Sequence, residues 1–281
     1  MRKESLYLQQ MTASCEQPAS VLAITSGKGG VGKTSIAANL AICMAASRKK
    51  VVLVDADLSL GNLDIIMNIN SKYNISHMVN GQKSIEEIIH TGPEGIEIIC
   101  GASGLEGLAN ISEFQRHRLL MELSKLQNNS DVIIIDTAAG ISRSVVGFCL
   151  ASDHTLVITT PEATAMTDAY AMIKVLVRNR FDGRISLIVN MADSQAEGKK
   201  VYQQVTNVAR RFLDTDIYDA GVLVRDDRLS SAVRLRKPVV LAYPKSQITS
   251  SLVALAAKLS SGLAVEPNKE GFFKKVVDWF F

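Results

Sequence analysis

The residues best placed to do chemistry form a glycine-rich segment near the start of this 281-residue sequence. Residues 27–34 read Gly-Lys-Gly-Gly-Val-Gly-Lys-Thr, which fits the phosphate-loop pattern GxxxxGK(S/T). Glycines let such a loop fold around phosphates and direct backbone N–H groups at them, and the next helix adds its positive end. We expect Lys33 to bridge the β- and γ-phosphates of a nucleotide and the Thr34 hydroxyl to bind Mg²⁺. The expected nucleotide contacts here are Gly27, Gly29, Gly30, Val31, Gly32, Lys33, Thr34 and Ser35.

Two apolar runs end in aspartates. Val-Asp-Ala-Asp occupies residues 54–57, and Ile-Asp-Thr-Ala-Ala-Gly occupies residues 135–140. Because ligands of open parallel sheets bind beyond the carboxyl ends of the strands, both runs should direct carboxylates towards the nucleotide. The second run fits a Walker B strand, so we expect Asp136 to hold Mg²⁺ through water. Gly140 is placed to offer a backbone N–H near the γ-phosphate.

The elements that must position these residues alternate along the chain. Short β-branched runs predict strands at residues 21–25, 51–54, 96–99, 132–135, 155–159, 185–189 and 217–222. Helix-period stretches predict helices at residues 34–47, 112–126, 142–151, 165–180 and 198–213. Strands that alternate with helices imply βαβ units. We therefore predict an α/β fold, a doubly wound, mostly parallel sheet with helices on both faces.

The same patterning divides the chain into four parts. Residues 1–20 are polar and predict a mobile N-terminal tail. Residues 21–260 contain no linker and predict one phosphate-loop domain. Residues 261–270 contain Gly, Pro, Asn and Glu and predict a linker, and residues 271–281 predict a separate short helix.

Composition narrows the functional classes. Lys plus Arg is 31 and Asp plus Glu is 28, and the resulting net charge of +3 does not indicate a dedicated nucleic-acid binder. The spacing of the four cysteines favours neither a zinc site nor a disulfide framework, and the four histidines are expected at the surface or as cap residues. No apolar run reaches the roughly 18 residues of a membrane span, and the N-terminus does not resemble a signal peptide. We therefore expect a cytoplasmic protein.

The last residues of the chain carry an aromatic face. Residues 271–281 read GFFKKVVDWFF, and at 3.6 residues per turn one face gathers Phe272, Phe273, Val276, Trp279 and Phe280. An aromatic face beside lysines suits a helix in a membrane interface, and eleven residues are too few to be stably helical alone in water. We expect an amphipathic helix that folds on contact with an anionic membrane. The alternative is a helix docked in a groove of its own domain, and each arrangement can belong to a different nucleotide state.

A second lysine in the loop, Lys28, makes the motif KGGxGK(S/T), and with it the chain resembles the MinD/ParA family of P-loop ATPases over about residues 20–260. The resemblance implies ATP/ADP and Mg²⁺ as ligands. It also implies an ATP-bound homodimer in which Lys28 reaches the phosphates of the partner subunit.

The resemblance assigns further roles by position. Asp55 would lie near Mg²⁺ together with Thr34 and Asp136, and Asp57 would orient the attacking water, so that Lys28, Lys33 and Asp57 carry catalysis. Asn190 would read the adenine edge, since an amide both donates and accepts, and Arg225 would belong to the loop that closes over the base. Without the resemblance, the position of Asn190 after a predicted strand equally fits a turn residue or a helix N-cap.

Within this family, residues 136–141, 167–174 and 190–192 are similar to the FlhG/FleN group. That similarity implies control of flagellar number and placement. The partners it implies are an FlhF-type GTPase, flagellar switch (C-ring) proteins and a flagellar transcription regulator. Many members carry an N-terminal DQAxxLR motif that stimulates FlhF, but residues 8–12 read Leu-Gln-Gln-Met-Thr and do not match it.

The expected function is a slow ATPase switch that cycles between a cytoplasmic monomer and a dimer at the inner face of the cell membrane. Three alternatives stay open: a MinD-type selector of the division site, a ParA-type DNA partition ATPase and a non-hydrolysing scaffold. The third would bind nucleotide without turnover. DNA is not an expected partner, because the basic residues are expected to form a solvated surface: Arg210, Arg211, Arg225, Arg228, Arg234, Arg236 and Lys237.

Overall fold

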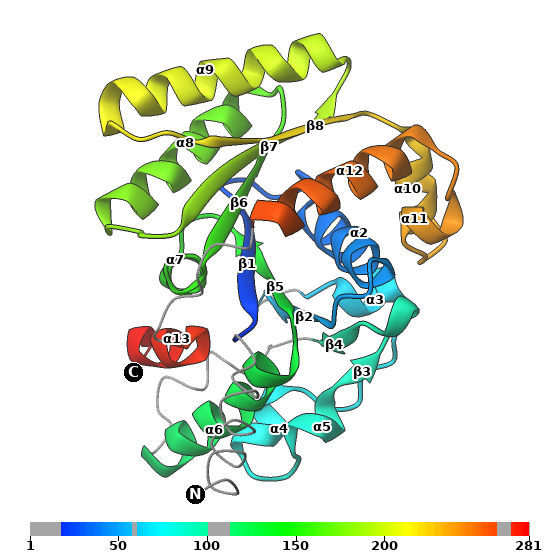
Figure 1. Cartoon of the computed structure of the whole chain (residues 1–281), viewed down its shortest axis with the longest axis vertical. Helices are drawn as coiled ribbons and strands as arrows, with labels where there is room; N and C mark the ends of the chain where they lie inside the picture. Colours follow the sequence, from blue (N-terminus) through cyan, green and yellow to red (C-terminus); the bar gives the residue numbers. More distant parts are fainter. Residues whose placement is uncertain (1–17, 58–60, 101–112, 263–270, 281) are drawn as a thin grey trace, which may run out of the picture.

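The computed structural model describes residues 18–57, 61–100, 113–262 and 271–280. The strands in these ranges are β1 (Ser20–Ser26), β2 (Val51–Ala56), β3 (His90–Thr91), β4 (Glu97–Ile99), β5 (Val132–Ala139), β6 (His154–Thr159), β7 (Arg184–Ala192) and β8 (Tyr218–Val224). They form one sheet in the order β3-β4-β2-β5-β1-β6-β7-β8 (Figure 1). Each neighbouring pair is parallel except β3 and β4, which confirms the predicted mostly parallel sheet.

Helices cover both faces of this sheet, as predicted (Figure 1). One face packs against α2 (Lys33–Ala46), α3 (Leu63–Met67), α11 (Val239–Ala242) and α12 (Gln247–Gly262). The other face packs against helices whose bounds are α4 (Ile75–Val79), α5 (Ile85–Ile88), α6 (Glu113–Asn129), α7 (Arg143–Ala151), α8 (Ala163–Arg178), α9 (Gln195–Leu213) and α13 (Phe272–Phe280). The short α10 (Asp227–Arg234) and the 3-10 turn η1 (Pro93–Gly95) complete the described helices.

Strand β1 shows how the sequence builds both layers. Leu22 and Ile24 belong to the hydrophobic cluster shared with α2 and α12, whereas Val21 and Ala23 belong to clusters on the opposite face. All four side chains are completely buried, as expected for a central strand of a parallel sheet. Because β1 lies between β5 and β6, the phosphate loop leaves from the middle of the sheet.

One histidine departs from the prediction. His154 begins β6 and is 3% exposed, and its Nε2 lies 2.7 Å from Ser186 Oγ. The expectation of a surface position was wrong because β6 is a central strand, so even its first side chain is covered. Burial lowers the pKa of His154 to about 4, and it is therefore neutral near pH 7.

Helix α13 lies beside α7 and α6 at the end of the chain (Figure 1). In this structure the segment takes the docked arrangement, which was the alternative left open by the sequence, and folding on contact with a membrane stays a prediction. None of the helices in the described ranges has the length and apolar character that crossing a membrane requires.

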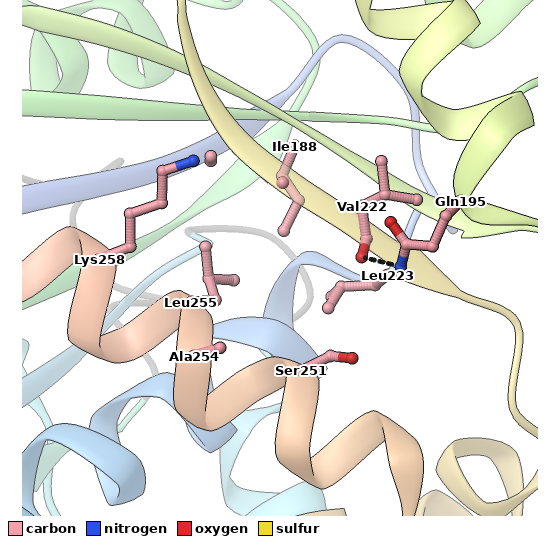
Figure 2. A pocket seen from close by; sticks show the side chains of 10 residues that line it. Ile188, Gln195, Val222, Leu223, Ser251, Ala254, Leu255 and Lys258 are labelled. Atoms are coloured by element: carbon pink, nitrogen blue, oxygen red, sulfur yellow. Dashed lines mark hydrogen bonds between the residues drawn. The ribbon is translucent and has the colours of Figure 1, made fainter.

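A cavity of about 240 Å³ lies between the edge strand β8 and α12 (Figure 2). Figure 2 shows an apolar floor that includes Ile188 and Leu255, with Lys258 at one rim. At the opposite side Gln195 Nε2 donates to Val222 O over 3.3 Å. No phosphate-loop residue lines this cavity, so it is separate from the nucleotide site described next.

Candidate nucleotide-binding site

The phosphate loop connects β1 to α2 and adopts a conformation that depends on glycine. Gly30 and Gly32 have φ of +78° and +91°, which L side chains rarely adopt. A Cβ at Gly29 or Gly30 would meet no atom within 4 Å, so the loop is open at these two positions. The first turn of α2 contains no acidic residue, which leaves its N-terminus free for an anion.

The end of β5 is fastened to this loop. Gly140 N donates to Ser26 O over 2.8 Å, and Thr137 Oγ1 donates to Ile24 O over 3.1 Å. Gly140 has φ of +93°, so this position too depends on glycine. The predicted phosphate loop and Walker B segment therefore meet. The Gly140 N–H, which was predicted to lie near the γ-phosphate, is bonded to Ser26 O in this structure, so its contact with phosphate stays a prediction.

Two buried carboxylates stand side by side next to the loop. Asp55 on β2 and Asp136 on β5 are paired in the sheet register, and each is 1% exposed. Asp55 accepts hydrogen bonds from Asp57 N (3.0 Å) and Leu63 N (3.4 Å). The Thr34 hydroxyl lies close enough to Asp136 to lower the pKa of that carboxyl, while Asp136 Oδ1 has no hydrogen-bond partner among the described residues.

The electrostatics of this pair fit a cation. Burial raises the pKa of Asp55 to about 6 and that of Asp136 to about 7, and the nearby Lys33 partly offsets the shift at Asp136. A divalent ion would relieve this desolvation and use the unpartnered Asp136 oxygen. The described residues contain no cluster of three His, Cys, Asp or Glu side chains that could hold a metal. A site with few protein ligands is typical of Mg²⁺, which keeps waters and shares phosphate oxygens.

The predicted Mg²⁺ ligands Thr34, Asp55 and Asp136 thus come together. Asp57 follows β2 directly, and residues 58–60 lie outside the described part of the chain. A Cβ at Gly61 would lie 2.5 Å from Asp55 Oδ2, so the returning chain passes close against that carboxylate. The role of Asp57 in orienting water stays a prediction.

Lys28 contacts the N-terminal end of α8. Its Nζ lies 2.5 Å from Glu162 Oε2 and 3.0 Å from Thr164 Oγ1. The two charged side chains remain 39% and 66% exposed, so solvent screens the pair. Lys28 also lowers the pKa of Glu162. Sequence reasoning could not pair Lys28 with Glu162, because a partner 134 positions away leaves no local signal.

The start of the loop also packs closely on α8. A Cβ at Gly27 would overlap the backbone carbonyl of Asp168. Asp168 belongs to the stretch 167–174 that carried part of the FlhG/FleN resemblance. In the structure this stretch lies in α8 and packs against the start of the phosphate loop.

Asn190 contacts the phosphate loop itself. Its Nδ2 donates to Val31 O over 2.8 Å, and the side chain is 2% exposed. A Cβ at Gly32 would lie 2.6 Å from the same Nδ2, so a glycine is needed there as well. Asn190 therefore holds the loop backbone, and adenine recognition stays a prediction. Arg225 lies farther out, exposed, with its Nε 3.7 Å from Asp193 Oδ1.

Sequence reasoning missed Asn39. This side chain is 1% exposed in the middle of α2, where Nδ2 donates to Ser35 O (2.6 Å) and Oδ1 accepts from Val240 N (3.1 Å). It links the helix of the phosphate loop to α11. The sequence did carry a signal for it, because Asn39 is the single amide in the otherwise apolar stretch 36–45.

The residues predicted to bind a membrane lie elsewhere, on α13. Phe272, Phe273 and Val276 are 2%, 5% and 8% exposed in an intramolecular cluster, and Trp279 is half-buried. The side chain of Phe280 lies outside the described part of the structure. In this structure Phe272, Phe273 and Val276 of the predicted membrane face are therefore covered by the chain itself.

Comparison with known proteins identifies relatives of the chain. A family profile described as an AAA domain matches residues 19–186. Antiactivator FleN of Pseudomonas aeruginosa is 37% identical over 244 residues, which cover 87% of this chain and 87% of that protein. Flagellum site-determining protein YlxH of Helicobacter pylori is 36% identical over 265 residues, which cover 92% of this chain and 90% of that protein. The septum site-determining protein MinD of Pyrococcus horikoshii, solved in complex with Mg-ADP, shares the fold with a TM-score of 0.71. That match covers 90% of this chain and 100% of that one, at 21% identity.

Proposed function

We propose that this chain, which belongs to the FlhG/FleN group of MinD/ParA-type P-loop ATPases, is an ATP-dependent dimerising switch that regulates flagellar number and placement. One relative is named an antiactivator and another a flagellum site-determining protein. The observation that carries the proposal is the phosphate loop with its second lysine. Lys28 lies at the surface on Glu162 while Lys33, Thr34, Asp55 and Asp136 form the phosphate and metal site.

ATP binding at residues 27–34 brings two subunits face to face. The loop N–H groups and the N-terminus of α2 bind the phosphates. Thr34, Asp55 and Asp136 would hold Mg²⁺, which would neutralise negative charge on the nucleotide. Lys28 leaves Glu162 and reaches the phosphates of the partner subunit. Asp57 orients the attacking water, and slow hydrolysis to ADP and phosphate separates the subunits.

Membrane attachment follows the same cycle. In the monomer α13 is docked on its own domain, so its apolar face is withheld from lipid. In the ATP dimer both copies of α13 are released to the inner face of the cell membrane. Two weak anchors on one particle bind far more tightly than one, because the second attachment is intramolecular. The monomer is then the cytoplasmic form and the dimer the membrane-associated form.

The partners that fit this function are an FlhF-type GTPase, flagellar switch (C-ring) proteins and a flagellar transcription regulator. They are proposed from the family and from the relatives' names. DNA is not among them. A MinD-type role at the division site uses the same chemistry with different partners, so it serves as the competing outcome of the test.

The test combines a biochemical and a cellular measurement. The protein is sedimented with anionic liposomes in ADP and in ATP, and we expect pelleting in ATP only. In a strain lacking its own copy, the wild-type gene should restore flagellar number and position, whereas Lys28→Ala should not. Restored placement of the division septum with unchanged flagella would replace the flagellar assignment by the MinD-type one.

A further inference from the structure

Helix α13 packs in a groove between α6 and α7. Phe272, Phe273, Val276 and Val277 are each less than a tenth exposed there, and Val277 is 1% exposed. Phe272 and Phe273 meet edge to face, with ring centroids 4.9 Å apart. Figure 1 shows α13 between α7 and α6, and the three helices share one buried cluster. Leu123 and Leu126 of α6 and Phe148 of α7 share the same buried cluster.

Polar contacts at one end make the groove selective. Trp279 Nε1 donates to Arg143 O over 3.0 Å, and Arg143 Nη2 donates back to Trp279 O over 2.9 Å. Arg143 thus binds a carbonyl in the last turn of α13, a group that a helix cannot satisfy internally. A Cβ at Gly147 would overlap the Trp279 ring, so the glycine of α7 provides the space for that ring.

We propose that this groove is a binding site for an amphipathic helix of a second protein, which enters when α13 leaves for the membrane. The inference rests on the proposed function, because it needs α13 to undock. Undocking exposes two apolar surfaces. Lipid covers the face of α13, but it does not cover Leu123, Leu126 and Phe148, which would be left facing water. A partner helix removes that exposed surface.

The partner helix should carry the same pattern of side chains as α13, because α13 fits this groove. The helix needs two adjacent aromatic residues, two aliphatic residues one turn later, and an aromatic N–H or O–H donor a further turn on. It also needs to end beside Arg143, which binds its terminal carbonyl. A lipid acyl chain offers neither a donor for Arg143 O nor an acceptor for Arg143 Nη2. A helix of this pattern offers both, so we assign the groove to a protein segment.

Membrane binding and partner binding become coupled through this single groove. The tethered α13 and the partner helix compete for the same site, so lipid that removes α13 strengthens partner binding. By linkage, the partner strengthens lipid binding by the same factor. Recruitment of a partner would then be confined to the membrane-bound form.

The test uses the full chain with a labelled peptide of residues 271–281 as the probe. Val277→Asp places a charge at a buried position and should release α13, while the groove stays intact. Emission of Trp279, the only Trp in the chain, should shift to the red and report the release. We expect the peptide to bind this variant at least tenfold more tightly than wild-type protein in ADP, because the tethered helix no longer competes. The same peptide with Val277→Asp is the matched control and should not bind.

Two further arms decide the outcome. Adding Gly147→Leu to the Val277→Asp chain fills the Trp279 position and should abolish peptide binding while nucleotide binding and cooperative unfolding persist. Peptide binding that survives this change, or no binding to the released chain with its fold intact, overturns the proposal.

The third arm adds ATP and anionic liposomes to wild-type protein, where peptide binding should rise in step with pelleting. Pelleting without a rise overturns the groove assignment and leaves the membrane cycle standing. If nothing pellets, the membrane cycle fails, and the Val277→Asp arm still tests the groove.

Discussion

Lys28 and Glu162 are 134 positions apart in the sequence, and their side chains meet at 2.5 Å beside the mouth of the phosphate loop. The contact keeps the second lysine of the loop at the surface of its own subunit. Lys28 is therefore a cation of the phosphate loop that is already paired and still accessible to solvent.

Two variants distinguish what the Lys28–Glu162 ion pair contributes to stability from what the Lys28 cation contributes to the proposed dimer. Both side chains are largely exposed, so Lys28→Ala and Glu162→Gln should each change the free energy of unfolding by less than about 1 kcal/mol. Only Lys28→Ala should lose ATP-dependent dimerisation and turnover, because only it removes the cation given to the partner. Urea unfolding and light scattering in ATP measure the two effects. Equal loss of dimer in both variants would show that the ion pair, and not the cation, is what dimerisation needs.

Asp136→Asn should stabilise the protein without Mg²⁺ while destroying the metal site. The folded-state pKa of Asp136 is raised to about 7 from an ordinary value of 3.8, so between these values the folded state binds more protons than the unfolded state. Stability of the wild-type protein in EDTA should therefore fall as the pH rises from about 4 to about 7. Asparagine removes the buried charge, and the variant should gain on the order of 2 kcal/mol at pH 8.

Urea unfolding in EDTA at pH 5 and pH 8 measures this effect, and Mg²⁺-dependent nucleotide binding is measured in parallel. Ser144→Ala, a change near the start of α7, serves as the reference. A variant that is less stable than wild type at pH 8 would contradict the assignment of a destabilising buried charge to Asp136.

Asp57→Ala should trap the ATP-bound dimer. The proposed role of Asp57 is to orient water, so its loss should slow hydrolysis about a hundredfold or more and leave ATP binding intact, as expected for loss of a positioned acid–base group. Phosphate release and size-exclusion chromatography in ATP follow the two properties. Normal turnover in this variant would remove Asp57 from the mechanism.

Asn190→Ala separates two roles for one side chain. If Asn190 chiefly holds the loop through Val31 O, its removal should weaken ATP and GTP binding by a similar factor of about ten, since a buried hydrogen bond is lost. If Asn190 reads adenine, ATP binding should fall while GTP binding stays unchanged. Isothermal titration with both nucleotides decides between them, and we expect the parallel loss.

The parts of the site that sequence could predict are those encoded by neighbours in the chain. The glycine spacing at residues 27–34 and the apolar run before Asp136 are local patterns, and both proved to meet at the middle of the sheet. The alternation of strands and helices gave the fold class. The contact of Asn190 with Val31 spans 159 positions, so only the folded sheet brings the two together.

The C-terminal helix shows the same limit in another form. Helical periodicity identified its aromatic face but not what covers it. The periodicity did not assign Val277 to the apolar face. This side chain is nevertheless 1% exposed, because α13 packs against two helices, α6 and α7, and so buries more than one face. Short elements such as β3 and α11 escaped prediction because two to four residues carry too little periodicity.

Gly27 lets the phosphate loop lie directly against α8. With no Cβ, the loop backbone rests directly on the carbonyl of Asp168, and no flexible side chain lies between them to absorb a displacement. A side chain at position 27 would therefore have to push the loop and α8 apart, so the distance between the phosphate loop and the helix Ala163–Arg178 depends on this glycine.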